Sequence, residues 1–400
     1  MPPKKACNTA PALGTKRLRS RSPSATVPGK EVKKTDRSKS QSPDRSLSLA
    51  NVPAPPAQVP RDDAKKTEQS IWSQVEPFRR RTDAKDFKPA EMFKFITWNV
   101  AGLRGLLKKD SNAIKKLLEE ERPDALCLQE TKLNVGDAAN ATLGAVKGYD
   151  FVDHPCSAKK GYSGTRTYIK KEIVEKWSVA SVRGFGDLNE RNCDPKAGSE
   201  GDDEGRVLTT YFGTDGKDGG GFEMALVNTY VPNSGMGLER LPYRHKTFDV
   251  KMREYLCKLT ASARTSAPDG RSSGANDAQP LVGVIWAGDL NVAERDYDRY
   301  FAGNYAAMQK CSGFTPEERT SFRETLKTVK AVDTFRELYP RAAPVYTFWS
   351  ARINGRARGL GWRLDYFVVS AALASRVVDC FTMPSVMGSD HCPLQMWLRK

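Results

Sequence analysis

The strongest constraint on the fold is a recurring pattern in which a short apolar run ends in an amide or a carboxylate. "FKFITWN" (93–99), "ALCLQE" (125–130) and "VIWAGDLN" (284–291) all have this form. Aromatic and β-branched residues favour strands, and a carboxylate at the end of a buried strand costs free energy unless it has a partner. The pattern therefore predicts a core of strands whose polar ends gather at one rim.

Helical patterns alternate with the strands. Residues 111–122 and 244–259 carry apolar side chains at helical spacing, and 315–326 begins with an N-cap threonine followed by a proline. The segments 95–104 and 284–295 share one layout, an apolar strand, then "NVA", then a short run to an arginine, which is a weak sign of two similar halves. Strands followed by helices favour α/β layers. We therefore expect a four-layer α/β sandwich, in which two packed mixed β-sheets are flanked by helices.

The first 88 residues differ in composition from the rest of the chain. They hold 20 Lys/Arg and 9 Asp/Glu, a net +11 of the whole chain's +16, and few apolar residues. Such a segment cannot bury enough apolar surface to fold. We therefore expect a disordered basic Ser/Pro-rich arm over 1–88 and a single folded domain over 89–400. Three stretches of the domain, rich in small and polar residues, are predicted to be surface insertions: 190–204, 213–221 and 262–280.

Charge and cysteine usage limit the partners and the location. A basic chain attracts polyanions, nucleic acid first among them, although a charge excess can serve solubility alone. "KRLRSRSPS" (16–24) resembles a nuclear localisation signal, so we expect the nucleus, with the mitochondrion left open because the first acidic residue is Glu31. The eight cysteines form no CxxC pair, which indicates a reducing compartment. No apolar run reaches the roughly 18 residues of a membrane span, so no membrane partner is expected.

Polar residues next to the predicted strands form the candidate site. They are Asn99, Glu130, Tyr230, Asn233, Asp289, Asn291, Asp365, Asp390 and His391. Several carboxylates at one rim require a cation, and oxygen ligands without a His/Cys cluster favour Mg²⁺, with Mn²⁺ as the alternative, over zinc. "GSDHCP" (388–393) is ambiguous by itself, because Gly-Ser-Asp is also ordinary turn chemistry.

A series of short motifs runs in a fixed order from Phe93 to Lys400. They are "WNVAGLR", "PDALCLQETK", "GYSGT", "EGRV", "NTYVPNSG", "AGDLNVA", "GFTPEER", "YTFW", "GWRLDYF" and "GSDHCP". In this order they resemble the exonuclease III family of apurinic/apyrimidinic (AP) endonucleases, within the endonuclease/exonuclease/phosphatase superfamily. Agreement over so many motifs is far more specific than a single match.

The resemblance implies a Mg²⁺-dependent phosphodiesterase of DNA base-excision repair. Such an enzyme cuts duplex DNA on the 5′ side of an abasic site, leaving a 3′-hydroxyl and a 5′-deoxyribose phosphate, and also works as a 3′-phosphodiesterase or 3′-5′ exonuclease. Its partner is double-stranded DNA that contains abasic sites; we expect a monomer, with other repair proteins as further partners. Two alternatives stay open: a superfamily phosphatase or phosphodiesterase with another substrate, and a DNA-binding paralogue whose catalytic site has decayed.

The same resemblance implies roles at the metal and the scissile phosphate. Glu130 looks like the principal metal ligand, Asp390 would lie near the metal, and Asn99 would support Glu130 or the metal's waters. His391 looks like the electrostatic clamp or base at the phosphate, with Asp365 holding its ring. The alternative for Glu130 is an exposed glutamate at a strand end, and a histidine such as His391 would by itself more often be structural.

Four further residues are implied to handle water and phosphate. Asp289 would orient or deprotonate the attacking water, and Asn291 would donate a hydrogen bond to the phosphate. Tyr230 and Asn233 would contact the phosphate or its approach. The competing readings are a Gly-Asp turn that caps a helix and a buried tyrosine that merely satisfies its hydroxyl.

Residues implied to bind DNA follow from the later motifs. Phe348 and Trp362 resemble an apolar pocket for a flipped, base-free sugar, whereas we expect Trp349 to pack in the core. Tyr162, Arg206 and Arg240, together with Arg104 and Lys132, are candidate backbone contacts, although solvated surface charge is an equal alternative for each.

The chain departs from the family pattern in two places. Ala101 stands where better-known nuclear members have an acidic residue, so one metal contact is in doubt. Met236 stands where the animal-type enzymes have arginine, and Arg352 where they have methionine. The two residues could still form a DNA wedge with their positions exchanged.

Overall fold

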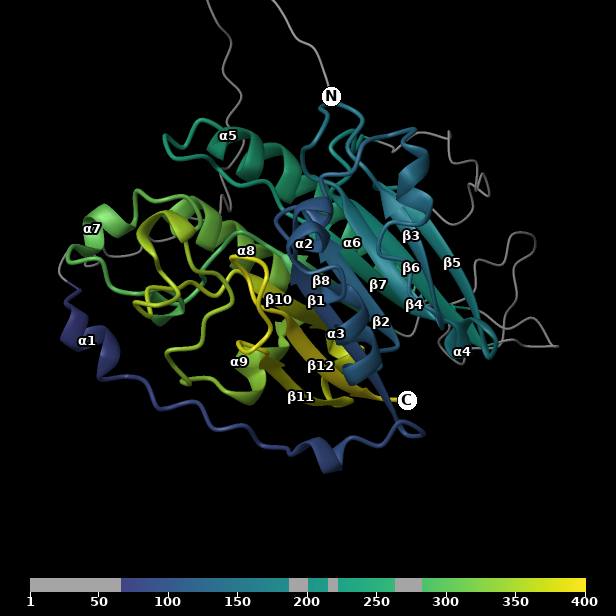
Figure 1. The fold of residues 1–400 in the computed structure, drawn as a ribbon. Helices are drawn as coiled ribbons and strands as arrows, with labels where there is room; N and C mark the ends of the chain where they lie inside the picture. The colour runs from purple at the N-terminus through teal and green to yellow at the C-terminus, as the bar shows by residue number, and fades with distance from the viewer. Residues whose placement is uncertain (1–65, 187–200, 215–221, 263–282) are drawn as a thin grey trace, which may run out of the picture. The chain divides into compact units, whose positions relative to one another are not determined.

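Two six-stranded β-sheets form the centre of the structure (Figure 1). The computed structural model describes residues 66–186, 201–214, 222–262 and 283–400. Within them, one sheet has the order β11-β12-β1-β2-β4-β3 and the other the order β5-β6-β7-β8-β10-β9. Both sheets mix parallel and antiparallel pairs.

The first sheet is built around β1. Its strands are β1 (Met92–Asn99), β2 (Ala125–Gln129), β3 (Tyr149–His154), β4 (Thr165–Lys170), β11 (Val377–Thr382) and β12 (Leu394–Arg399). β1 pairs in parallel with β2 and antiparallel with β12. All eight residues of β1 are buried, which explains its nearly continuous apolar sequence, because both faces of the strand are covered.

The second sheet is built around β8. Its strands are β5 (Trp177–Arg183), β6 (Val207–Thr214), β7 (Phe222–Tyr230), β8 (Gly283–Asp289), β9 (Ala331–Asp333) and β10 (Asp365–Ser370). β8 pairs in parallel with β7 and antiparallel with β10. It is also fully buried, so β8 in this sheet has the same central environment as β1 in the first.

The main core lies between the two sheets. Phe95 and Met396 of the first sheet pack in one cluster with Ile285 and Phe367 of the second. A buried polar contact also joins the sheets, because Gln129 Nε2 donates to Asn228 Oδ1 at 2.8 Å. This contact links β2 of the first sheet to β7 of the second and helps to fix the relative position of the sheets.

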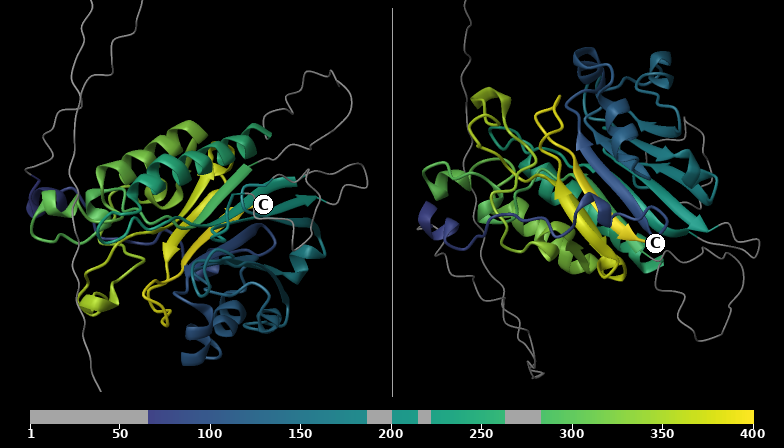
Figure 2. Two further views of the ribbon diagram at one scale, coloured as in Figure 1. Left: turned by 90° about the horizontal axis from the view of Figure 1, so that it is seen from above. Right: turned by 60° about the horizontal axis from the view of Figure 1, so that its bottom comes forward.

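Helices cover the outer face of each sheet, as the two views in Figure 2 show. α2 (Leu103–Lys109) and α3 (Ala113–Glu121) pack on the first sheet, and α6 (Asp249–Ser262) and α8 (Pro316–Val329) pack on the second. The shorter helices are α1 (Glu68–Trp72), α4 (Lys171–Val174), α5 (Leu241–Tyr243), α7 (Tyr305–Met308), α9 (Thr334–Leu338) and α10 (Ala371–Ala374). The predicted four-layer α/β sandwich is confirmed.

α8 begins where the sequence predicted. The hydroxyl of Thr315 accepts from the backbone N–H of Glu318 at 3.2 Å, and the Glu318 carboxylate accepts from the backbone N–H of Thr315 at 3.1 Å. This reciprocal capping box satisfies two backbone donors that the helix leaves free.

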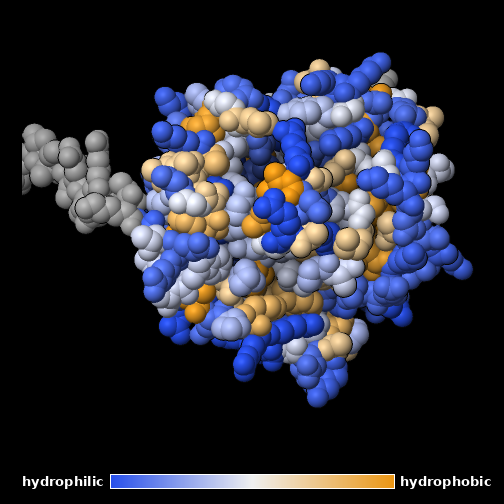
Figure 3. All heavy atoms as spheres, turned by 60° about the vertical axis from the view of Figure 1, so that its left-hand side comes forward, coloured by the Kyte–Doolittle hydropathy of each residue, from blue (hydrophilic) through white to orange (hydrophobic). Residues whose placement is uncertain are grey.

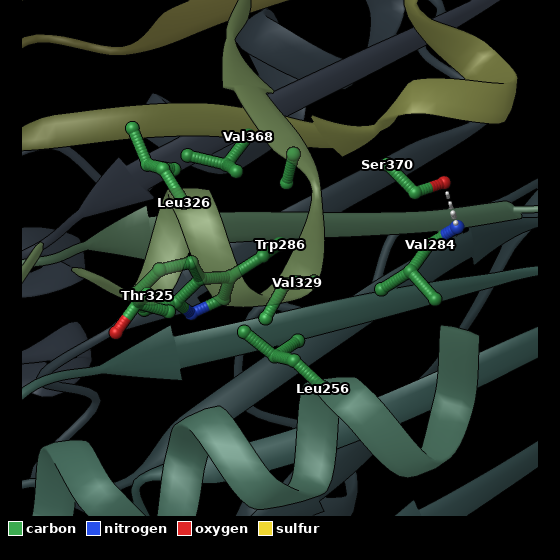
Figure 4. A pocket seen from close by; sticks show the side chains of 9 residues that line it. Leu256, Val284, Trp286, Thr325, Leu326, Val329, Val368 and Ser370 are labelled. Carbon is green, nitrogen blue, oxygen red and sulfur yellow. Dashed lines mark hydrogen bonds between the residues drawn. The ribbon is translucent and has the colours of Figure 1, made fainter. Parts of the chain in front are cut away.

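A small apolar cavity remains under α6 and α8 (Figure 4). Leu256 of α6, Val329 of α8 and Trp286 and Val368 of the sheet line it. It lies on the helix-covered face of the second sheet, where the three-way contact between two helices and a twisted sheet is hard to fill.

No helix of the described part of the chain is both long and apolar enough to span a membrane.

The ordered domain begins earlier than predicted, because residues 66–91, here called the strap, pack along the sandwich before β1 (Figure 1). Ile71 in α1 is buried, and the ring of Phe78 lies 5.0 Å from that of Tyr339. Arg80 Nε lies 2.9 Å from Asp379 Oδ2, a fully buried carboxylate. The folded domain was predicted to begin at residue 89, and the structure shows that residues 66–88 also belong to it. Residues 1–65 of the predicted arm, and most of the three predicted insertions, lie outside the described residues.

A buried ion network anchors the chain just before β10. Asp298 accepts from Arg363 Nε and Nη2, both at 2.9 Å, and from Arg336. Arg363 also donates to Asp333 at 2.7 Å. Burial alone would raise the pKa of the Asp298 carboxyl, but Arg336 and Arg363 hold this pKa well below its usual range.

Asp298→Asn is expected to lower the free energy of unfolding at pH 7 by about 3 kcal/mol, because it leaves the buried Arg336 guanidinium without its anion and Arg363 with Asp333 alone. The pKa of Asp298 is depressed in the folded state, so its contribution is complete above the unfolded pKa of about 3.9 and is lost as the pH falls below that. Urea unfolding should be measured at pH 7 and in steps below pH 4. The difference in the free energy of unfolding between wild type and variant should become smaller as the pH falls. The exposed Asp203→Asn is the matched control, and a gap that does not change with pH would contradict the assignment.

Candidate active site

The register of the second sheet places three candidate residues side by side. Tyr230 at the end of β7 pairs with Asp289 at the end of β8. Asp289 in turn pairs with Asp365 at the start of β10. Neighbouring strands lie about 4.8 Å apart, so the three side chains share one edge of the sheet.

The first sheet delivers its candidate residues to the same rim. Asn99 ends β1, Glu130 follows β2, and His391 precedes β12, and β1 lies between the other two strands. Asn99 Nδ2 donates to Glu130 Oε1 at 3.0 Å and to Asp289 Oδ2 at 2.9 Å. This one amide therefore joins the polar ends of both sheets.

His391 lies between two carboxylates. Its Nδ1 donates to Asp365 Oδ2 at 2.8 Å, and its Nε2 lies 3.8 Å from Asp289 Oδ2. Burial alone would lower the pKa of this imidazole, but Asp365 and Asp289 raise it to about 10. His391 is therefore a buried imidazolium at neutral pH, suited to holding a phosphate oxygen.

Asp289 has the opposite perturbation. Burial raises the pKa of its carboxyl to about 7, and the like charge of Asp365 adds to this, while His391 opposes it. A carboxylate that titrates near neutral pH can accept a proton from water. The surroundings therefore keep His391 protonated as a cation and leave Asp289 able to act as a base.

Two asparagines extend the rim beyond Asp289. Asn291 donates its backbone N–H to Asp289 Oδ1 at 2.9 Å, and its Oδ1 accepts from Asn233 Nδ2 at 2.9 Å. Asn291 adopts φ +48° and Gly288 adopts φ +133°. At Gly288 a Cβ would lie 2.0 Å from the carbonyl oxygen of Thr229, so the turn that presents Asp289 requires glycine there.

Glu130 is held by a neighbouring lysine. Lys132 Nζ lies 2.9 Å from Glu130 Oε2 and also donates to the Ala101 carbonyl at 3.2 Å. Burial alone would raise the pKa of Glu130, but Lys132 and Asn99 lower it below its usual value. Lys132 therefore forms an ion pair inside the site, and its contact with the DNA backbone stays a prediction.

Glu130 and Asp390 are the carboxylates that fit a divalent cation. Both are half-buried, and they flank Asn99 at one edge of the sheet. Carboxylate oxygens suit Mg²⁺ and Mn²⁺. In the described ranges no group of three or more His, Cys, Asp or Glu side chains could enclose a metal ion, so these donors suit a cation that keeps several waters. Asn99 brings its NH₂ to the site, because its oxygen accepts from the backbone N–H of Ala101.

The predicted sugar pocket adjoins His391. The ring of Phe348 lies 4.9 Å from the His391 ring, and Phe348 exchanges both backbone hydrogen bonds with Trp362, at 2.8 and 2.9 Å. The Arg299 guanidinium lies 3.9 Å from the Trp362 ring. Trp349, expected in the core, is only 9% exposed. Half-buried aromatic rings beside the imidazolium form a wall that a small apolar group could pack against.

The predicted wedge residues contact each other. Met236 is 85% exposed, the highest fraction among the exposed large hydrophobic residues of the described chain. Arg352 Nη1 lies 2.9 Å from Met236 Sδ. The two therefore come from different loops to one position above the rim.

The predicted backbone contacts divide into two groups. Arg206 is 1% exposed, and its guanidinium donates to Glu204, to Tyr162 and to the Tyr230 carbonyl. The prediction of a direct DNA contact is therefore wrong for Arg206, which positions Tyr230 instead. Tyr162 and Arg240 are half-buried and keep part of their surface free, and Arg104, paired with Asp137, is exposed.

Three residues that support the site were not predicted. The Ser389 hydroxyl donates to the Asn99 carbonyl at 2.7 Å and accepts from the His391 N–H. The Thr347 hydroxyl accepts from the Asp365 N–H at 3.1 Å, and Arg244 donates to the Asn291 carbonyl at 2.9 Å. Ser389 and Thr347 lie inside motifs already singled out, "GSDHCP" and "YTFW", which was the available signal.

The chain matches known proteins over the part that builds this site. Residues 96–391 match the model of the Endonuclease/Exonuclease/phosphatase family. The chain is 38% identical to the DNA repair nuclease APEX1 of Danio rerio over 319 residues, covering 79% of this chain and 84% of that protein. It is 37% identical to a DNA-(apurinic or apyrimidinic site) endonuclease of Dictyostelium discoideum over 303 residues, 75% of this chain and 69% of that protein.

Among solved structures, the crystal structure of an AP endonuclease from Leishmania major superposes with a TM-score of 0.76 at 59% identity, covering 84% of this chain and 97% of that one. An AP endonuclease from Archaeoglobus fulgidus superposes with a TM-score of 0.54 at 27% identity, covering 76% and 98%.

Proposed function

This chain belongs to the endonuclease/exonuclease/phosphatase family, and from that premise we propose that it is an AP endonuclease of DNA base-excision repair. It hydrolyses the phosphodiester on the 5′ side of an abasic site in duplex DNA and leaves a 3′-hydroxyl and a 5′-deoxyribose phosphate. The observation that carries the proposal is the convergence of His391, Asp365, Asp289 and Glu130, linked through Asn99, on one rim.

The residues of the rim divide the chemistry between them. Asp289 orients a water molecule and accepts its proton as the oxygen attacks phosphorus in line with the leaving 3′-oxygen. The His391 imidazolium, the Asn291 amide and the Tyr230 hydroxyl donate to the phosphate oxygens as negative charge builds up. Burial raises the pKa of Tyr230 well above its ordinary value, so its hydroxyl stays a donor. Fixed donors of this kind act more strongly in a site that excludes water.

Glu130 and Asp390 would hold the Mg²⁺ ion, with Mn²⁺ as the alternative. When bound, the metal supplies charge stabilisation at the phosphate and the leaving oxygen. Lys132 gives Glu130 a cationic partner in addition, so the carboxylate stays ionised and oriented before the substrate arrives.

Substrate choice follows from the aromatic wall. A flipped abasic sugar packs against Phe348 and Trp362, next to the imidazolium at the phosphate. A normal nucleotide brings a base that needs room of its own. The same site would also remove blocking groups from the 3′ ends of DNA strands.

We propose that the protein acts as a monomer in the nucleus.

The experiment that tests this function is an incision assay on a duplex with one abasic site, using the full chain with Mg²⁺. We expect one cut on the 5′ side of the lesion and no cut with a chelator. Glu130→Gln should lower the rate by about 100-fold or more, because it removes the anion that faces the cation. Glu119→Gln, an exposed glutamate on α3, is the matched control. A Glu130→Gln protein as active as wild type, or wild type that cleaves a phosphoinositide but not the duplex, would reject the proposal.

A further inference from the structure

The turn that precedes His391 is clamped by one arginine. Arg356 Nη2 donates to the carbonyls of Pro384 at 2.6 Å and Val386 at 3.2 Å, and Arg356 Nη1 donates to that of Ser389 at 3.4 Å. The guanidinium also lies 4.7 Å from the ring of Trp349. We name residues 384–389 the clamped turn. Three carbonyls held by one planar, permanently charged group leave the turn little freedom.

The clamped turn is fixed on its other side as well. Gly388 adopts φ +120°, and a Cβ there would lie 2.5 Å from Leu106 Cδ1 of α2. The Ser389 hydroxyl donates to the Asn99 carbonyl at 2.7 Å. The turn therefore packs against α2 and the end of β1, and its geometry is set by the same contacts that place His391.

One large apolar side chain projects from this fixed turn. Met387 is 63% exposed, and the other most exposed large hydrophobics of the described chain are Met236 at 85% and Val135 at 61%. Met387, Met236 and Val135 lie in the loops before β12, after β7 and after β2, and these segments adjoin His391, Tyr230 and Glu130 respectively. On the face drawn in Figure 3, apolar residues appear as separate patches within a mainly polar surface. Single exposed apolar residues are common on protein surfaces, so the place of Met387 next to the site, together with its exposure, indicates a binding role.

We propose that Met387 is a further DNA-contacting residue, presented by the clamped turn, and that Arg356 is its positioning residue. This inference rests on the proposed function. Met387 stands four positions before His391, so the two Cα atoms lie within about 14 Å of each other. At 3.4 Å per nucleotide along a strand, Met387 therefore reaches DNA within about four nucleotides of the scissile phosphate.

The chemistry around Met387 fits DNA better than a protein partner. The neighbouring loop carries Arg352 and Arg358, both exposed, so the apolar side chain has basic neighbours and no exposed acid of its own turn. Proteins that bend DNA insert such flexible apolar side chains between or beside bases while basic groups hold the backbone. An abasic site removes one base from the stack and so provides room for the thioether.

The test measures the affinity of the full chain for abasic and intact duplexes of one sequence, by fluorescence anisotropy at fixed salt with a chelator present, so that no cutting occurs. Met387→Gln should bind the abasic duplex about five- to tenfold more weakly, because it loses the burial of an apolar side chain. The loss for the intact duplex should stay within about twofold. Val174→Gln, which changes an exposed valine on α4, is the matched control and should bind as wild type does.

Arg356→Gln tests the positioning role against Arg399→Gln, which changes an exposed arginine at the end of β12 whose guanidinium donates to the Ser375 carbonyl at 3.4 Å. Arg356→Gln should weaken abasic binding as Met387→Gln does, and the double variant should bind no more weakly than either single one. Additive losses would overturn the role of Arg356. Wild-type affinity of Met387→Gln would overturn the contact itself, while a wild-type protein that neither prefers nor cuts the abasic duplex would instead reject the proposed function.

Discussion

Replacing His391 with asparagine is expected to lower kcat for cleavage of an abasic duplex by about 10³-fold or more. The substitution removes a buried imidazolium that two carboxylates stabilise, one at 2.8 Å and the other at 3.8 Å. Asparagine can still donate a hydrogen bond to a phosphate oxygen but carries no charge. Single-turnover rates at saturating enzyme separate this loss from a change in binding.

The chain offers a matched control, because it has only three histidines. His245 lies on the π-helical turn Arg244–Phe248, outside the strands that form the rim, and His245→Gln should cleave at close to the wild-type rate. If His391→Asn retained more than about a tenth of the wild-type single-turnover rate while binding normally, the imidazolium would not be the main electrostatic group.

Deleting residues 1–88 is expected to destabilise the domain strongly, whereas deleting residues 1–65 is not. The longer deletion removes Ile71 and Phe78 from their apolar contacts and leaves the buried Asp379 without Arg80. The deletion removes the burial of two large apolar side chains and the cation that pairs with the buried Asp379. Together these losses should lower the free energy of unfolding by about 5 kcal/mol or more. Differential scanning calorimetry should therefore show a Tm lower by roughly 10 °C for the longer deletion alone.

Two neighbouring arginines separate the effect of the ion pair from that of chain length. Arg80→Ala should reproduce part of the loss, since Arg80 also lies 3.3 Å from the Phe381 ring. Arg79→Ala, one position earlier and exposed, should leave Tm within about 1 °C of wild type. Equal Tm values for the two deletions would mean that the strap contributes nothing to the stability of the domain.

The pattern of apolar runs with polar ends was enough to predict the fold class and the gathering of the site. Asn99 and Asp289 are the last residues of buried strands, and His391 precedes a buried strand by three residues. Side-chain alternation and strand pairing then fix where such residues point. The convergence of residues nearly three hundred positions apart could therefore be anticipated from local pattern and motif order.

Other features depend on pairing that a sequence does not display. Arg206 looked like a surface cation, but its acidic partner Glu204 and its aromatic neighbours bury it. Most of the strap was predicted to belong to the basic arm, yet Arg80 pairs with Asp379, 299 residues further along the chain. Composition predicts only whether a segment as a whole can bury enough apolar surface to fold. A single acidic partner elsewhere in the chain can still bind a basic side chain and hold its segment against the domain.

The position of the last strand in the first sheet has a consequence for synthesis. β12 lies between β11 and β1. One side of β1, the first strand of the chain in this sheet, therefore has no strand partner until β12, the last, has been synthesised. A ribosome-bound chain that has emerged only as far as β11 possesses Glu130 and Asp289 but not the imidazole that lies beside them. Every nascent chain that ends before residue 391 therefore lacks the imidazolium of the site.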